Sequence, residues 1–220
     1  MRYRFVGDIH GQLEILDAFL DCDADKIIFV GEFMDSWRRS PEDQIQCVRR
    51  VLKEIEDGRA EAVFGNHEMS YISPEYRCTG HTAEAQTLFD HIKYEVLEKF
   101  KPFVSLANGK ILVTHAGLTR QLWEAHNLTT ENYQQALTEW FHEGHTSPFF
   151  QVGQRRGGVH PFGGPLWCDF MEFQSVPEIY QIFGHSRGAR FRHLDSAVCI
   201  DVNENGNPEA LDMEILPDVE

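Results

Sequence analysis

The sequence contains no long hydrophobic run. No apolar stretch is long enough to cross a bilayer, and the chain opens into a strand-like segment at Arg2 without the basic and then apolar segments of a secretion signal. We therefore expect no membrane association and a soluble, cytoplasmic protein.

The cysteines provide no disulfide framework. The five cysteines are odd in number, widely spaced and form no CxxC pair, which argues against a disulfide scaffold. Reduced thiols in a cytosolic setting are the simplest interpretation. The five are Cys22, Cys47, Cys78, Cys168 and Cys199.

Basic residues are in deficit. The 20 Lys and Arg residues stand against 35 Asp and Glu residues, which gives a formal net charge of −15. A surface of that charge repels polyanions, so we expect no nucleic-acid polymer as a partner. Small phosphate esters are not excluded, because bound divalent cations would make a cleft locally positive.

The length and composition suit one globular domain. The chain has 220 residues, of which 42% are hydrophobic. Gln12–Leu20 has helical spacing between two strand-like runs, and Ser40-Pro41 is an N-cap followed by proline that opens a helix through about Ile55. Alternation of strands and helices indicates βαβ units, and we predict a single α/β domain over residues 1–220.

The later part of the chain mixes helices with an antiparallel component. Asn108-Gly109 joins two apolar runs as a two-residue hairpin turn. We further predict a loop over Met69–Gly80, one helix over His81–Phe100, a helix over Thr129–Phe141, an irregular segment over His142–Pro165, and a strand, turn and strand over Ser196–Val202, Asn203–Pro208 and Ala210–Leu216.

Polar clusters containing Gly or His follow five of the strand-like runs. Open α/β sheets place their chemistry beyond the carboxyl ends of the strands. Carboxylate, amide and imidazole groups delivered there from separate strands can supply the ligands that a polynuclear divalent-metal site needs. The clusters are Gly7-Asp8-Ile9-His10-Gly11, Gly31-Glu32-Phe33-Met34-Asp35, Gly65-Asn66-His67-Glu68, His115-Ala116-Gly117 and Gly184-His185-Ser186.

These motifs and their order, from residue 7 to residue 186, resemble the calcineurin-like metallophosphoesterase superfamily. The Gly-Asn-His-Glu form is similar to the PPP-type serine/threonine phosphatases, especially the small bacterial and phage (lambda-like) members. The resemblance implies a mixed β-sheet core, a β-sandwich, flanked by helices. It also implies hydrolysis of a phosphoester by water that two divalent metal ions activate, with manganese as the activator in vitro and iron or zinc as alternatives in the cell.

The resemblance also assigns roles to individual residues. His67 would pair with Asp35, stay protonated and donate a proton to the leaving group, while water attacks in line. Any one of the strand-end histidines could by itself be structural, and the order of the whole set gives the assignment its weight. The implied metal ligands are Asp8 and His10 for the first ion, Glu32 as the bridge, and Asn66, His115 and His185 for the second.

The chain departs from the family pattern at two positions. The usual segment is Gly-Asp-x-x-Asp-Arg-Gly, whereas here Glu32 replaces the bridging Asp and Ser36 replaces the phosphate-binding Arg. Glu keeps the charge and both oxygens but is one methylene longer, so it can bridge with a changed metal spacing, or bind one ion and weaken the second site.

The missing arginine leaves the phosphate anchor to another residue, because a guanidinium fork is the usual partner of phosphate oxygens. Arg38 and Arg39 follow directly in the sequence. The Arg-Gly element of the irregular segment, Arg155-Arg156-Gly157-Gly158, and the Leu-Trp-x-Asp element that follows the segment resemble the substrate side of small PPP-type enzymes. On that basis we favour Arg156 as the anchor. The second choices are Arg155 and Arg77, which lies in the loop after Gly-Asn-His-Glu.

Three functions stay open. The first is a phosphomonoesterase acting on phosphoserine or phosphothreonine in a peptide, or on small aryl and nucleotide phosphates. The second, by resemblance to symmetrical dinucleoside tetraphosphate hydrolases, is a dinucleoside polyphosphate hydrolase. The third is a catalytically impaired binding module, which Glu32 and Ser36 favour and the retained Asp35 and His67 oppose.

Aromatic residues beside the predicted loops have two interpretations. Flat rings at the rim of a cleft can stack on a nucleobase or a phenyl ring, but such residues also form core under a long loop. For Trp167 and Phe170 we favour the core. The candidates are Trp37, Phe149, Phe150, Phe162, Trp167 and Phe170.

Overall fold

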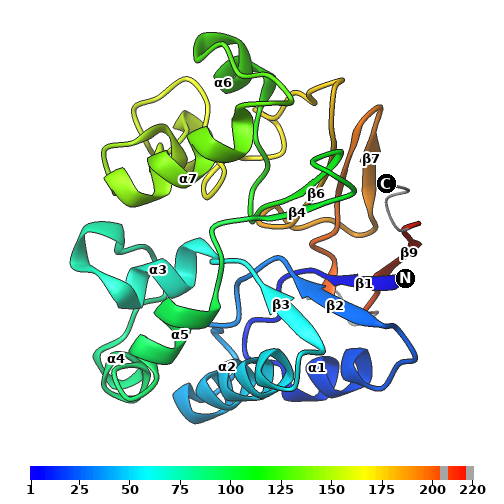
Figure 1. Cartoon of the computed structure of the whole chain (residues 1–220). Helices are drawn as coiled ribbons and strands as arrows, with labels where there is room; N and C mark the ends of the chain where they lie inside the picture. The colour runs from blue at the N-terminus through cyan, green and yellow to red at the C-terminus, as the bar shows by residue number, and fades with distance from the viewer. Residues whose placement is uncertain (204–207, 217–220) are drawn as a thin grey trace.

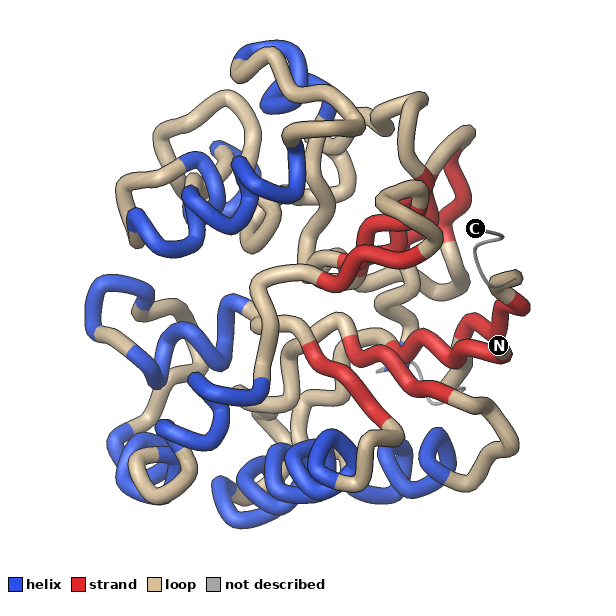
Figure 2. Tube along the Cα trace, in the orientation of Figure 1, coloured by secondary structure: helices blue, strands red, loops and turns tan. Residues whose placement is uncertain are grey.

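The molecule contains two β-sheets, and helices flank them below, on the left and at the upper left in Figure 1 and Figure 2. The computed structural model describes residues 1–203 and 208–216. Three strands of the first sheet are parallel and the fourth is an antiparallel edge strand. The order in this sheet is β3 (Ala60–Ala62), β2 (Lys26–Phe29), β1 (Arg2–Val6) and β9 (Leu211–Glu214).

The second sheet lies above the first in Figure 1 and is also mixed. Its three central strands are parallel, and each edge strand is antiparallel to its neighbour. The order is β4 (Val104–Leu106), β5 (Ile111–Val113), β6 (Tyr180–Phe183), β8 (Ala197–Cys199) and β7 (Arg192–Leu194).

An apolar layer joins the two sheets face to face. Side chains of a strand alternate between its two faces, so Ile28 belongs to this layer while Ile27 and Phe29 belong to the cluster on the helical side. The two mixed sheets flanked by helices confirm the predicted mixed β-sandwich. The layer consists of Phe5, Ile28, Val30, Val63, Val104, Val113, Ile182, Val198 and Ile200.

Helices α1 (Leu13–Leu20) and α2 (Pro41–Glu56) lie along the outer face of the first sheet (Figure 1). As predicted, α2 has Ser40 as its N-cap, whose side chain accepts a hydrogen bond from the Asp43 backbone N at 3.2 Å. Within the described residues, no helix is both long enough and apolar enough to span a bilayer.

The predicted loop over Met69–Gly80 is wrong in its first part, which belongs to helix α3 (Asn66–Ile72). The helix forms because Glu68 accepts a hydrogen bond from the Gly65 backbone N at 3.1 Å and so closes the first turn. Burial of Tyr71 further stabilises this helix.

The predicted helix over His81–Phe100 is instead two helices, α4 (Ala83–Phe89) and α5 (Lys93–Lys99), which both pack against α2. The chain leaves the helical path at residues 90–92. Phe89 before the bend and Ile92 at its end are both buried in the same hydrophobic cluster.

The hairpin prediction is confirmed. Asn108 and Gly109 have φ angles of 51° and 84°, the positive values that a two-residue type I′ turn requires, and Lys110 N donates to Ala107 O at 3.1 Å. Strands β4 and β5 on either side of the turn are antiparallel.

The remaining differences concern short elements. Helix α7 covers Tyr133–Glu143 and not Thr129–Phe141, because Thr129 N donates to Asn132 Oδ1 at 2.7 Å in a turn that precedes the helix. Helix α6 (Arg120–Ala125) and strand β7 had no prediction. The turn predicted at Asn203–Pro208 falls mostly on residues 204–207, which lie outside the described residues.

Candidate metal centre

The five predicted polar clusters meet at one edge of the sandwich, where strands of both sheets end. Backbone hydrogen bonds join the clusters directly. Ile9 N and His10 N donate to Glu32 O at 2.9 and 3.0 Å, and Gly184 N donates to His115 O at 2.8 Å. Segments that are far apart in the sequence therefore present their side chains to a common point, as open α/β sheets do.

Several of these residues have an unusual backbone conformation. His10, Glu32, Asp35 and His185 all have positive φ angles, of 48°, 65°, 61° and 66°. Non-glycine residues in this region carry a cost of ~1–3 kcal/mol each and cluster at functional sites. The turns that follow the strands thus hold these side chains at a conformational cost that the surrounding fold offsets.

Glycine allows two of the clusters to touch. A Cβ atom on Gly31 would lie 2.5 Å from Gly65 N, and a Cβ atom on Gly65 would lie 2.5 Å from Glu32 N. No other residue could occupy either position without moving a backbone segment. The close approach places Glu32 next to the start of α3, which carries Asn66 and His67.

Glu32 lies at the centre of the site. Its Oε1 atom is 3.3 Å from His10 Nε2, and its Oε2 atom is 3.1 Å from His115 Nε2 and 3.9 Å from His185 Nδ1. One carboxylate therefore belongs to two groups of potential metal ligands, Asp8 with His10 on one side and His115 with His185 on the other. The additional methylene of Glu does not prevent it from reaching both.

Backbone carbonyls orient two of the imidazoles. His10 Nδ1 lies 3.2 Å from Met34 O, and His115 Nδ1 lies 2.8 Å from Val30 O. A carbonyl can only accept, so Nδ1 carries the hydrogen in both rings. The opposite nitrogen of each ring, Nε2, then faces Glu32, and a carbonyl that holds the other ring nitrogen is the arrangement of metal-binding histidines.

Asn66 completes the second group. Its Oδ1 atom lies 2.7 Å from His115 Nε2 and 3.0 Å from His185 Nδ1, and the two ring nitrogens are 3.0 Å apart. Glu32 Oε2 and His185 Nε2 are buried without a hydrogen-bond partner among the described residues. Several lone pairs thus converge on a point where a divalent cation would satisfy them, and the nitrogen and oxygen donors fit such an ion.

The charge states also suit metal binding, which requires deprotonated ligands. Burial lowers the pKa of His185 to about 3, so this ring is neutral. Burial opposes ionisation of Glu32, but the neighbouring His10 and His67 hold its pKa well below its usual range.

Asp8 has the opposite shift. Burial, and then the charges of Asp201 and Glu32, raise its pKa well above its usual range. Three acidic groups in one buried place repel one another, and a cation between them would remove that repulsion. The first group of potential ligands therefore also fits a divalent ion.

His67 and Asp35 form the predicted pair. His67 Nδ1 lies 2.6 Å from Asp35 Oδ2, and His67 Nε2 lies 3.1 Å from Glu32 Oε1. Burial disfavours the imidazolium, but the charge of Glu32 and the hydrogen bond to Asp35 raise the pKa of His67 well above its usual range. Tyr71 OH donates to Asp35, and Asp35 N donates to Gln44 Oε1 at 2.6 Å. These two hydrogen bonds fix the position of Asp35 and, through it, the His67 ring.

Glu68, in the same motif, has a structural role that the sequence did not reveal. It is fully buried and accepts hydrogen bonds from the backbone N atoms of Glu32 at 2.9 Å, Phe33 at 2.8 Å and Met34 at 3.0 Å, in addition to Gly65. One carboxylate thus fastens the loop after β2 to the start of α3 and sets the position of Glu32.

A cavity of about 320 Å³ opens over the site. Arg156 reaches it, donating to His185 O and Ser186 Oγ at 2.9 Å each, while its Nε lies 3.0 Å from Asp169 Oδ2. Arg77 and Arg155 are exposed and do not occur among the described residues that line the cavity. Those lining residues are His10, Glu32, Asp35, Trp37, His67, Thr79, Arg156, His185, Arg187 and Asp201.

The aromatic candidates separate into two kinds. Phe149 and Phe150 are buried, whereas Trp37 is 85% exposed and lines the cavity. Trp167 is half-buried, and its ring centroid lies 5.7 Å from that of His185. The core interpretation of Trp167 is thus only partly accurate, since the ring also forms a wall behind a potential ligand.

Asp201 was not predicted as part of the site. It follows β8, is 3% exposed and lines the cavity, and burial together with the charge of Glu32 raises its pKa to about 6. Its Oδ1 atom has no hydrogen-bond partner among the described residues. The signal in the sequence was available, because Asp201 follows a strand-like run just as the five other clusters do.

The fold recurs in a known phosphatase. The cold-active protein-tyrosine phosphatase of a psychrophilic Shewanella species superimposes with a TM-score of 0.67 at 15% identity, over 97% of this chain and 75% of that one. A protein serine/threonine phosphatase from Saccharomyces cerevisiae aligns with a TM-score of 0.49 at 15% identity, over 90% of this chain and 66% of that one. The first likeness shows a shared fold.

Curated protein sequences gave no significant match. The calcineurin-like phosphoesterase family, however, matches residues 1–186. This span includes all five motif clusters and the two groups of potential metal ligands that share Glu32. The match confirms the resemblance drawn from those motifs, and the chain belongs to the calcineurin-like phosphoesterase family.

Proposed function

We propose that the protein hydrolyses phosphomonoesters, with water activated by two divalent cations as the nucleophile. The observation that supports this most strongly is the position of Glu32, whose two oxygens face two separate groups of nitrogen and oxygen donors. A carboxylate shared in this way is what a pair of cations requires, and a single-ion site would leave one of the two groups without a purpose.

The ligands would divide between two ions. Asp8 and His10 would hold the first and Glu32 would bridge, and the second would be held by Asn66, His115 and His185. When bound, the two cations would neutralise the phosphate oxygens and make hydroxide available near neutral pH. We propose manganese as the activator in vitro, with iron or zinc as alternatives.

His67 would act as the general acid. Its Nδ1–H is held by Asp35 at 2.6 Å, so Nε2 is the nitrogen that faces the cavity. The raised pKa of His67 keeps the ring protonated, and the imidazolium can deliver its Nε2 proton to the leaving oxygen.

Arg156 would bind the outer oxygens of the phosphate. Of the three predicted arginines, it is the one that lines the cavity. Its backbone belongs to the turn over residues 153–157, in which Arg156 N donates to Gly153 O at 3.0 Å. Its bonds to Asp169 and His185 hold the guanidinium beside the ligand groups before substrate arrives.

The substrate class that we propose is a phosphoserine or phosphothreonine peptide, or a small aryl or nucleotide phosphate. The test is release of phosphate from phenyl phosphate, a phosphopeptide and a nucleoside monophosphate by protein loaded with Mn²⁺. Asp8→Asn and His115→Asn serve as variants that weaken one group of ligands each, and Asp43→Asn, on the surface of α2, serves as the control.

Metal-dependent turnover that both ligand variants lose and the control keeps would support the proposal. No turnover by the wild type or by Glu32→Asp would contradict it and would favour the binding module. Turnover confined to diadenosine tetraphosphate would favour the dinucleoside polyphosphate hydrolase.

A further inference from the structure

A second cavity, of about 240 Å³, adjoins the metal centre. It shares Trp37 and Arg187 with the cavity over the ligands, so the two cavities are neighbours. Their combined size lies within the range of ~300–1,000 Å³ that small-molecule sites occupy. We name this second cavity the arginine pocket, and its lining residues are Gln12, Ser36, Trp37, Arg38, Arg39 and Arg187.

The arginine pocket differs in charge from the rest of the molecule. Three of its six lining residues are arginines and none is acidic, although the chain as a whole has a net charge of −15. Arg39 forms an ion pair with Glu14, which lies outside the lining. A local positive potential on an acidic protein attracts anions to that place.

The chemistry of the lining selects the kind of anion. Guanidinium groups bind phosphate oxygens in pairs and stay charged at all relevant pH values. Ser36 occupies the position where the family has its phosphate-binding Arg, and its Oγ accepts from Arg38 N at 3.3 Å. The turn so formed carries Arg38 and Arg39 past the metal ligands and into the neighbouring cavity.

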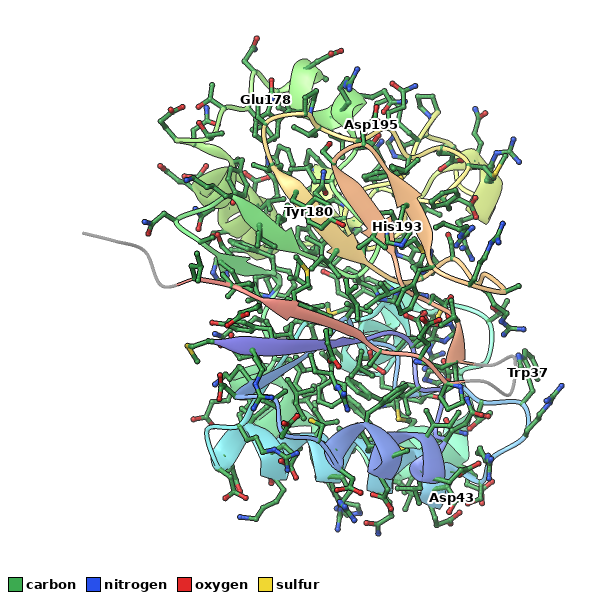
Figure 3. All side chains as sticks on the ribbon, turned by 90° about the vertical axis from the view of Figure 1, so that its right-hand side faces the viewer. Trp37, Asp43, Glu178, Tyr180, His193 and Asp195 are labelled. Atoms are coloured by element: carbon green, nitrogen blue, oxygen red, sulfur yellow. The ribbon has the colours of Figure 1, made fainter. Side chains whose placement is uncertain are left out.

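Trp37 adds a flat surface between the two cavities. Its side chain is 85% exposed, which is rare for tryptophan, and Figure 3 shows it projecting outward at the rim of the molecule. An exposed indole beside cationic side chains can contact the part of a ligand that connects two anionic groups.

We propose that the arginine pocket binds a second phosphate group of the substrate while the scissile phosphate lies at the metal centre. The substrate class is therefore a bisphosphorylated small molecule, in which the second phosphate is a separate ester. This inference rests on the proposed phosphomonoesterase function, which it makes more specific.

The binding step can be tested without catalysis. Metal-free protein, kept in chelator, is titrated with inorganic pyrophosphate while tryptophan fluorescence is followed. We expect a saturable change that Trp37→Phe abolishes and Trp167→Phe retains, because only Trp37 lines the arginine pocket. The double variant Arg38→Gln/Arg187→Gln should weaken binding at least about tenfold, since the loss of a single charge-assisted contact already has about that effect.

Arg49→Gln is the matched control, because Arg49 is an exposed arginine of α2 that lies outside the pocket lining. It should leave the titration unchanged. All of these positions are on the surface or half-exposed, and thermal unfolding of each variant checks that the fold is intact. Absence of a saturable change, or equal affinity in the double variant, would overturn the proposal.

The catalytic step uses protein loaded with Mn²⁺ and two substrates with matched alcohol leaving groups, propyl phosphate and 1,4-butanediol bisphosphate. The wild type should prefer 1,4-butanediol bisphosphate over propyl phosphate in kcat/KM. The double variant should lose about tenfold of that preference, and Arg49→Gln should keep it.

The two experiments fail in different ways. Turnover without any preference for a second phosphate would contradict the proposed role of the arginine pocket but would still support the proposed phosphomonoesterase function. If no substrate is turned over, the proposed function fails, and the fluorescence titration still decides whether the pocket binds phosphate.

Discussion

At the scale of single residues, the side chain of Glu32 decides whether the site is functional. It is longer than the Asp of the family pattern, yet its oxygens lie 3.3 Å from His10 and 3.1 Å from His115. Its backbone has a positive φ angle and is held by the hydrogen bond from Glu32 N to Glu68, so the loop presents this longer side chain to both groups of potential ligands. The substitution is accommodated by the loop, so we expect it to be native to a working site.

Shortening this side chain should therefore lower activity. In Glu32→Asp the carboxylate would no longer reach both groups of ligands from the present backbone, and one metal ion should bind more weakly. We expect ten- to a hundredfold weaker binding of that ion, the range typical when ligand support is lost, and a comparable fall in kcat/KM at limiting metal. Higher activity than in the wild type would show that Glu32 disables this chain.

The Asp35–His67 pair predicts a dependence on the leaving group. Asp35→Asn weakens the hydrogen bond that orients the His67 ring and helps to keep it protonated. For an alkyl phosphate, whose leaving oxygen needs a proton, kcat should fall by about 100-fold or more. For 4-nitrophenyl phosphate, whose leaving group needs little assistance, the fall should be much smaller, and an equal loss for both substrates would exclude general-acid catalysis by this pair.

Arg156 predicts a separable effect on substrate. Arg156→Ala should raise KM or lower kcat/KM, because the phosphate loses a guanidinium partner, while the metal content stays that of the wild type. Arg155→Ala is the matched control, since the neighbouring side chain is exposed and does not line the cavity. Unchanged kinetics in Arg156→Ala would reject its role as phosphate anchor.

At the scale of elements, the loop after β2 and the start of α3 form one unit, which Glu68 holds together through four backbone N–H groups. Glu68→Gln keeps the shape of the side chain but replaces one acceptor oxygen by an NH2 group, which cannot accept a hydrogen bond. We expect a loss of about 1–3 kcal/mol in the free energy of unfolding, the cost of leaving buried donors unpaired.

Chemical denaturation measures that loss, and Glu98→Gln, at an exposed position of α5, is the control. The same Glu68→Gln variant should also bind metal more weakly, because the loop positions Glu32. Wild-type stability in Glu68→Gln would mean that these hydrogen bonds do not fasten the loop.

The elements that could be predicted from the sequence are those with local signals. Ser40-Pro41 marks the start of α2 and Asn108-Gly109 marks the hairpin, because capping and turn chemistry act within a few residues. The bend at residues 90–92 and the helix at Asn66–Ile72 depend on burial against distant segments, which no local pattern contains.

The candidate site follows the same division. The potential ligands after β1, β2, β3, β5 and β6 could be predicted, because functional side chains of α/β sheets follow the carboxyl ends of strands and because the motifs keep the order of the family. The structural role of Glu68 and the positive φ angle of Glu32 emerged only from the folded chain. Asp201 follows a strand-like run, so its place at the cavity could have been predicted. Arg77 and Arg155 were second choices because of their places in the chain, and the structure puts both on the surface outside the cavity lining.

At the scale of the whole molecule, the site joins the two halves of the sandwich. The first sheet provides the segments that carry Asp8, His10 and Glu32, and the second provides those that carry His115 and His185. Ions bound there would connect the two sheets at the edge where their strands end. Binding to the folded state alone also stabilises a protein by mass action, so metal should raise the thermal midpoint of unfolding.

The most direct measurement is the number and pairing of Mn²⁺ ions per chain, by elemental analysis after gel filtration and by electron paramagnetic resonance. Our account predicts two ions per chain, magnetically coupled through the shared Glu32, and loss of that coupling in Glu32→Ala. A single uncoupled ion in the wild type, or no bound ion at all, would contradict it.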